Sequence, residues 1–191
     1  MGAMVLEKGA TFFDPDAATR KIIAANDSIT LGEANSMAWH DGVRMLQQAI
    51  DERLYFVLET TLGGSTIAGM LESALERGAE VSVWYVGLNS PELHVARVRA
   101  RVLLGGHDIP EEKIRERYEQ SQYNLIRLLP RLTELQLFDN SEEADRYAGI
   151  PPKPKLILHM DRQKIVGGCD LTVANEWTRA ILVEAYRARR N

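Results

Sequence analysis

The sequence predicts an α/β fold in which helices flank a mostly parallel sheet, and three observations lead to this prediction. Short apolar runs that end at turn residues alternate along the chain with longer segments of helical periodicity. The helical segments are long enough to act as crossover connections, which join parallel strands. The chain has 191 residues, of which 45% are hydrophobic and 26% are charged, a balance typical of one soluble globular domain.

The first third of the chain contains two expected strands and two expected helices. A short strand over residues 10–13 ends where Asp14-Pro15-Asp16 interrupts the apolar run. Helices follow over residues 17–25 and 34–52, and the longer one offers apolar side chains for a buried face. Residues 54–58 read Leu-Tyr-Phe-Val-Leu without interruption, as expected of a strand that is covered on both faces.

The alternation continues through the middle of the chain. A helix is expected over residues 66–77 and a strand over residues 81–86. Ser90 fits the N-cap of the next helix and Pro91 its first position, and that helix should stop at Gly105-Gly106.

A further helix is expected to open at Pro110, and a fourth strand to cover residues 135–138. The side chains that repeat at helical spacing in this helix are Ile114, Tyr118, Ser121, Leu125 and Leu128.

Pro151-Pro152-Lys153-Pro154 is the clearest linker, and it divides a core of residues 1–150 from an extension of residues 151–191. The extension is expected to pack on the core with a β-hairpin and a terminal helix. These elements are expected at residues 156–159, 164–166 and 175–187.

Composition excludes several classes of function. The net charge of −4 gives no reason to expect binding to nucleic acid or membranes. No apolar run approaches the roughly 20 residues that span a bilayer, and the first residues, which have no basic stretch or long apolar core, are not expected to be a signal peptide. Cys169 is the only cysteine, which excludes an intrachain disulfide and predicts a cytoplasmic protein.

Polar residues follow several of the expected strands. In parallel sheets ligands bind beyond the carboxyl ends of the strands, so these residues are expected to lie along one edge. The groups are Asp14 and Asp16, Glu59 to Thr61, Gly87 to Asn89, and Asp139-Asn140.

Two of the carboxylates have a functional and a structural interpretation. Asp16 could accept a proton from a substrate hydroxyl, although spacing alone favours a helix N-cap. Glu59 ends a strand that is expected to be buried, where a charge is costly unless it is paired or opens into a cleft. It could hold a hydroxyl of a substrate, help to place magnesium through water, or form a buried ion pair with an arginine.

A cluster of five arginines could form an anion site, and its members are Arg97, Arg99, Arg101, Arg115 and Arg117. Arg97 and Arg101 are four residues apart and share a helix face, and Arg117 lies on the next helix. Two helices hinged at Gly105-Gly106 could close these arginines over phosphates. The alternative is surface pairing with the glutamates Glu92, Glu111, Glu112 and Glu116.

His107 could touch phosphate or act in the local turn.

Several motifs are similar to those of the zeta-toxin-like P-loop kinases. The chain resembles this family over roughly residues 2–141. The motifs run from Phe56 to Gly64 (Phe-Val-Leu-Glu-Thr-Thr-Leu-Gly-Gly), from Arg97 to Val102, from Gly105 to Pro110, and through Arg117-Tyr118 and Ser121-x-x-Asn124-Leu125.

The resemblance implies a P-loop NTPase-like fold and a kinase that transfers the γ-phosphoryl of ATP or GTP, with Mg²⁺, to a hydroxyl of a small acceptor such as a nucleotide-sugar. It implies that Asp16 is the base and that Glu59, Thr60 and Thr61 hold the acceptor. Arg101 and Arg117 then stabilise the transferring charge, and Arg97 and His107 contact the nucleotide. An antitoxin protein is an implied partner.

The loop that names these kinases is not found in the sequence. G-x-x-x-x-G-K-[ST] needs a lysine directly after a glycine, and none of the six lysines follows one. Residues 2–8 resemble the end of the helix that follows this loop, so the first strand and the loop are expected to be missing. We therefore expect little kinase activity and self-association through unpaired strand edges. The alternative function is a non-catalytic module that binds a nucleotide-sugar or an antitoxin.

Overall fold

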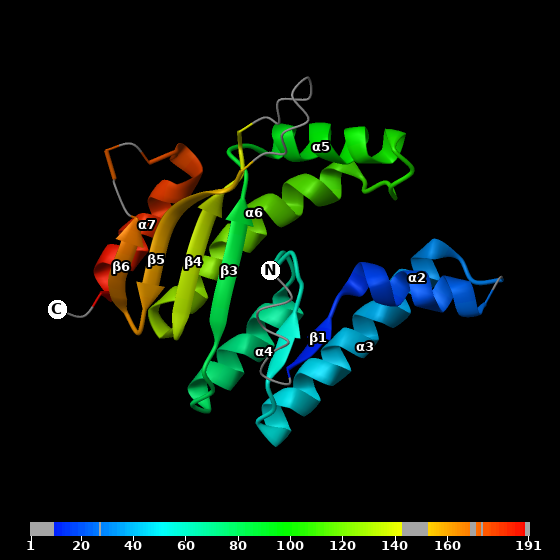
Figure 1. Cartoon of the computed structure of the whole chain (residues 1–191), viewed down its shortest axis with the longest axis horizontal. Helices are drawn as coiled ribbons and strands as arrows, with labels where there is room; N and C mark the ends of the chain where they lie inside the picture. Colours follow the sequence, from blue (N-terminus) through cyan, green and yellow to red (C-terminus); the bar gives the residue numbers. More distant parts are fainter. Residues whose placement is uncertain (1–9, 27, 143–152, 169–170, 173, 190–191) are drawn as a thin grey trace. The chain divides into compact units, whose positions relative to one another are not determined.

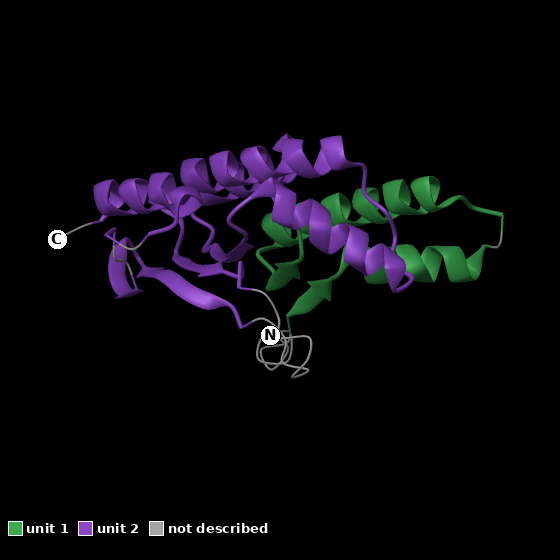
Figure 2. Cartoon of the chain, turned by 90° about the horizontal axis from the view of Figure 1, so that it is seen from above, with its two compact units in different colours: residues 1–61 green, residues 62–191 purple. Residues whose placement is uncertain are grey.

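A computed structural model of the chain describes residues 10–26, 28–142, 153–168, 171–172 and 174–189 (Figure 1). The chain divides into two compact units, residues 1–61 and 62–191, each of which is described by itself (Figure 2). The expected division at residue 150 falls outside the described residues and stays a prediction, as does the assignment of residues 2–8. Among the described residues, no helix is both long and apolar enough to cross a membrane.

The first unit pairs two short parallel strands and two helices. In chain order these are β1 (Thr11–Phe13), α2 (Pro15–Ala25), α3 (Leu31–Glu52) and β2 (Phe56–Leu58). Phe13 is buried against α3, where a Cβ on Gly42 would lie 2.6 Å from the Phe13 ring. The face of α3 that carries Gly42 is built from small residues, which lets β1 approach the helix closely.

Two expectations for this unit need correction. The longer helix begins at Leu31 rather than residue 34, because Thr30 and Glu33 form a capping box at its start. The strand expected over residues 54–58 contains only Phe56–Leu58 and is not fully covered on both faces, since all three of its residues are only partly buried. Among the described strands β2 pairs with β1 alone.

The second unit is built on a four-stranded sheet with the order β3-β4-β5-β6. Its elements are α4 (Ser65–Glu76), β3 (Ser82–Gly87), α5 (Pro91–Leu103), α6 (Glu111–Leu128), the 3-10 turn η1 (Leu129–Arg131), β4 (Glu134–Asp139), β5 (Lys155–Asp161), β6 (Lys164–Gly168) and α7 (Glu176–Ala188). The caps predicted for α5 are confirmed, because the Ser90 side chain accepts a hydrogen bond from the Leu93 amide at 3.2 Å and Pro91 is the first helical residue.

The four-stranded sheet is mixed rather than mostly parallel, and β1 and β2 form a separate two-stranded sheet in the first unit. β1–β2 and β3–β4 are parallel pairs, whereas β4–β5 and β5–β6 are antiparallel. The predicted hairpin is confirmed as β5–β6, and its two loop residues, Arg162 and Gln163, both adopt left-handed φ values of 44° and 64°. Such a turn matches the twist of the strands that it joins, so the hairpin reverses the chain and adds antiparallel strands to the parallel pair.

The core of the second unit lies on one face of its sheet. Alternate residues of β4 and β5 point into it, and α6 and α7 pass behind the sheet in the view of Figure 1. The residues with at most 3% exposure that build this core include Leu125, Leu128, Leu135, Leu137, Leu158, Met160, Ile181 and Leu182. This packing fixes α6, which carries the candidate residue Arg117.

Candidate functional site

In the first unit, the carboxyl ends of β1 and β2 bring two groups of polar residues to one edge. Phe13 pairs with Leu58, and the Glu59 amide donates to the Phe13 carbonyl at 3.0 Å, which extends the parallel ladder. Asp14 to Asp16 therefore follow one strand at the point where Glu59 to Thr61 follow the other. The predicted grouping is confirmed within this unit.

The two candidate carboxylates of this edge are exposed. Asp14, not Asp16, is the N-cap of α2, and its side chain accepts a hydrogen bond from the Ala17 amide at 3.0 Å. The capping alternative for Asp16 is therefore wrong. Asp16 and Glu59 make no hydrogen bond or ion pair through their side chains with any residue that the structure describes, so the buried ion pair considered for Glu59 is also wrong.

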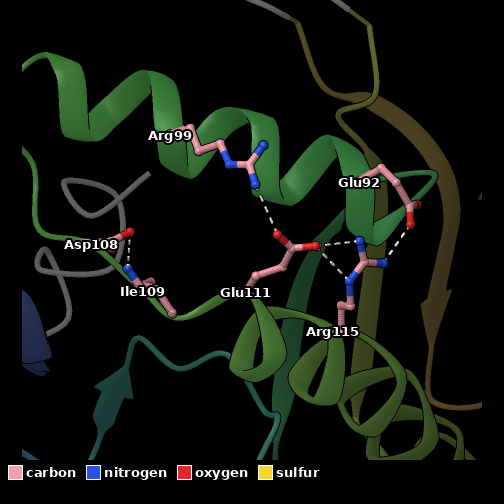
Figure 3. A network of polar contacts seen from close by, with 6 residues as sticks. All are labelled: Glu92, Arg99, Asp108, Ile109, Glu111 and Arg115. Carbon is pink, nitrogen blue, oxygen red and sulfur yellow. Dashed lines mark hydrogen bonds and ion pairs between the residues drawn. The ribbon is translucent and has the colours of Figure 1, made fainter.

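In the second unit, two arginines of the cluster are neutralised by carboxylates. Arg115 donates to Glu92 on α5 at 2.6 Å and to Glu111 on α6 at 2.7 Å, and Arg99 reaches Glu111 at 3.0 Å (Figure 3). These hydrogen bonds with Arg115 lower the pKa of both glutamates. Surface pairing with glutamates therefore occurs at Arg99 and Arg115, which clamp α5 to α6.

The three arginines that the resemblance assigns to the nucleotide have no carboxylate partner among the described residues. Arg97 donates to the Glu142 backbone carbonyl at 3.0 Å, and Arg101 donates to the His107 carbonyl at 3.4 Å. Arg117 is exposed and makes no hydrogen bond or ion pair with a described residue. Their charges therefore remain available for an anionic ligand.

The turn between α5 and α6 is shaped around Arg101. Gly105 adopts a φ of 87°, and a Cβ on Gly106 would lie 2.6 Å from Cγ of Arg101. Two glycines are needed because the first is left-handed and the second lies against the arginine stem. His107 contributes its backbone carbonyl to Arg101, which supports the structural interpretation of this histidine.

Asp139, another polar residue at the edge of the sheet, is structural. It is 8% exposed and accepts hydrogen bonds from the Ser141 amide at 3.0 Å and from the Asn175 side chain. Nearby, the Asn140 Oδ1 and Trp177 Nε1 atoms are buried without a hydrogen-bond partner. Trp177 packs directly under Gly87, where a Cβ would lie 2.3 Å from the ring. The predicted edge of β3 and β4 is therefore closely packed.

The donor set suits phosphate better than metal. Arginines without carboxylate partners match the charge of nucleotide phosphates. In contrast, no cluster of three histidine, cysteine or carboxylate side chains within the described part of the chain could hold a metal ion. The charge of the candidate arginines thus matches that of phosphate groups.

Asn124 belongs to one of the sequence motifs, but the sequence alone assigned it no role. Asn124 is 1% exposed, and its side chain binds the backbone of residues 62 and 64. Leu62 is left-handed with a φ of 53°, a conformation that costs about 1–3 kcal/mol and persists only when its surroundings hold it. The sequence signal for such a role was a polar residue at a position of α6 where the helical repeat favours an apolar one.

Comparison with protein families adds to this geometry. The model of the family described as zeta toxin matches residues 15–149, more than half of the chain. The chain belongs to the zeta toxin family. This membership supports a kinase-like protein of the P-loop type, and all eight candidate site residues lie within the matched region.

A relative from Haemophilus influenzae (strain ATCC 51907 / DSM 11121 / KW20 / Rd), described as an uncharacterized protein, is 36% identical over 81 residues. The match covers 42% of this zeta toxin family chain and 58% of the relative, which is less than two thirds of the relative's length. No solved structure matches the chain.

Proposed function

We propose that this zeta toxin family chain carries part of a kinase site that transfers the γ-phosphoryl of ATP or GTP to a hydroxyl of a small acceptor, such as a nucleotide-sugar. The observation that carries the proposal is the division of the arginines. Arg99 and Arg115 form ion pairs with glutamates, whereas Arg97, Arg101 and Arg117 form no ion pair with a carboxylate among the described residues.

Each residue then has a role that its chemistry allows. Arg101 and Arg117 stabilise negative charge on the transferring group, Arg97 orients the phosphates, and His107 helps to place Arg101 through its backbone carbonyl. In the other unit, Asp16 accepts the proton of the acceptor hydroxyl at a carboxylate oxygen, and Glu59, Thr60 and Thr61 hold the acceptor. Bound magnesium nucleotide supplies the phosphoryl group.

The expected rate of transfer by the chain as given is low. The sequence has no glycine-lysine pair of the phosphate-binding loop. Charge stabilisation by arginine is only one component of phosphoryl transfer, which also needs the metal and the loop to place the phosphates. We therefore expect binding to be measurable more readily than turnover.

Calorimetric titration with magnesium-ATP tests the proposal. We expect saturable binding that weakens about 10- to 100-fold in Arg101→Ala and in Arg117→Ala, because each loses a charge-assisted hydrogen bond. Arg99→Ala is the matched control, since Arg99 lies on the same helix but pairs with Glu111. Equal losses in all three variants, or no binding to the wild-type chain, would contradict the proposal.

A second candidate function is a non-catalytic module that binds a nucleotide-sugar or an antitoxin. The lack of a glycine-lysine loop in the sequence favours it. UDP-N-acetylglucosamine is a suitable probe. Binding of this probe without ATP, together with no binding of magnesium-ATP, would favour this candidate over the kinase. Location in the cytoplasm stays a prediction from composition.

A further inference from the structure

Asn124 forms a fully satisfied buried anchor in the second unit. Its Nδ2 donates to the Leu62 carbonyl at 2.8 Å and to the Gly64 carbonyl at 3.1 Å, and its Oδ1 accepts from Gln120 Nε2 at 3.1 Å. These two carbonyl-bearing residues precede Asn124 in the chain by 62 and 60 positions, respectively. Both amide hydrogens are used, so neither aspartate nor an aliphatic residue can replace this arrangement.

The turn held by Asn124 also touches Arg117. A Cβ on Gly63 would lie 2.8 Å from both Cβ and Cγ of Arg117 and 3.1 Å from its Cα. The absence of a side chain at Gly63 is therefore what allows the turn to lie against the arginine stem. Packing on this turn constrains the stem of Arg117, whose guanidinium pairs with no described carboxylate.

Arg117 and Asn124 lie on one face of α6. They are seven residues apart, which is about two helical turns, so both side chains point to the same side of the helix. The Leu62–Gly64 turn meets this face at both places, through hydrogen bonds at Asn124 and through van der Waals contact at Arg117. The position of the turn against Arg117 thus depends on the hydrogen bonds of Asn124.

We propose that Asn124 is a positioning residue for Arg117. Its two donor bonds hold the Leu62–Gly64 turn against α6, and Gly63 in turn fixes the stem of Arg117. The inference deepens the proposed function, because it rests on that function for the contact between Arg117 and phosphate. The positioning itself can be measured without any ligand.

The first measurement follows the Arg117 side chain by NMR in the ¹⁵N-labelled full chain. The Nε–Hε signal of Arg117 is assigned by its loss in Arg117→Lys, and its heteronuclear NOE reports order on the picosecond to nanosecond timescale. We expect this NOE to fall in Asn124→Ala and in Gly63→Ala. It should be unchanged in Gln120→Ala, which keeps both donor bonds of Asn124. The Arg101 signal should not change in any variant.

Gly63→Ala keeps Asn124 and its side-chain donors. If circular dichroism shows that Asn124→Ala does not fold, Gly63→Ala alone tests whether the turn positions Arg117. A Cβ at position 63 pushes the turn away from Arg117, because it would overlap the arginine stem. An unchanged Arg117 NOE in a folded variant of either kind would overturn the proposal.

The second measurement is a double-mutant cycle with magnesium-ATP as the probe. Asn124→Ala should weaken binding about tenfold, as expected when a phosphate-binding arginine is mispositioned. Added to Arg117→Ala it should cause no further loss, since the two residues act through one contact. Additive losses would overturn the proposal. If the wild-type chain does not bind magnesium-ATP, the proposed function fails, and the NMR result still decides whether Asn124 positions Arg117.

Discussion

Arg97, Arg99 and Arg101 lie on one helix, but only Arg99 pairs with a carboxylate among the described residues. Helix geometry accounts for the difference, because residues four apart share a face whereas the residue between them points elsewhere. The spacing of the arginines was readable from the sequence. The partner of Arg99 was not, since Glu111 reaches it from a different helix.

Gly42 offers a test of packing at the level of one residue. We expect Gly42→Ala to destabilise the chain by about 1–3 kcal/mol, because the new Cβ would lie 2.6 Å from the buried ring of Phe13. The measurement is the free energy of unfolding in urea, followed by circular dichroism.

Gly69 is the matched control for Gly42. It lies in α4, and a Cβ there would meet no atom within 4 Å. Gly69→Ala should therefore stabilise the chain by about 0.5–1 kcal/mol through the lower entropy of the unfolded state. Equal effects at the two positions would show that Phe13 does not pack against α3 as described.

The clamp between α5 and α6 makes a prediction at the level of elements. Arg115 bridges Glu92 and Glu111, so Arg115→Ala should loosen α5 from α6 and increase amide hydrogen exchange in α5. Lys113→Ala is the control, because Lys113 pairs with Glu116 within α6 and bridges nothing. Equal exchange in Arg115→Ala and the wild-type chain would show that the clamp does not hold the helices.

The same clamp should depend on pH. Hydrogen bonds with Arg115 hold the pKa of Glu92 and Glu111 below the usual 4.5. A carboxyl group whose pKa is lowered in the folded state stabilises that state at pH values above its unfolded pKa. The clamp is therefore fully formed above about pH 4.5 and is lost as the pH falls below this value. The difference in exchange between Arg115→Ala and the wild-type chain should therefore shrink in acid.

The elements that sequence analysis placed well carry their own local signals. Ser90-Pro91 begins α5, Gly105-Gly106 ends it, and the apolar spacing of α6 is regular. The burial expected for residues 54–58 was wrong because an apolar run does not show whether other elements pack on both faces of the strand. The role of Asn124 was missed because its partners lie about 60 positions away.

On the scale of the whole molecule, sheet topology depends on contacts that local patterns do not specify. The β3–β4 pair is parallel, as the crossover through α5 and α6 requires. The hairpin β5–β6 then adds antiparallel strands, which the sequence predicted as a hairpin but not as part of this sheet. Whether a strand pairs with an existing edge depends on shape and burial across the entire unit.

The edges of this sheet predict self-association. Among the described strands β3 pairs only with β4, and its six residues contain no charge, proline or bulge to discourage another strand. By contrast, β6 at the other edge carries Lys164 and pairs irregularly with β5.

We expect association of the chain that increases with concentration in sedimentation velocity experiments. The substitution Val86→Lys on β3 should reduce this association. Val166→Lys on β6 is the matched control, because both valines are about half exposed and only the first lies on the edge strand that has no charge, proline or bulge. A chain that stays monomeric at every concentration, or that responds equally to both substitutions, would show that the β3 edge does not drive association.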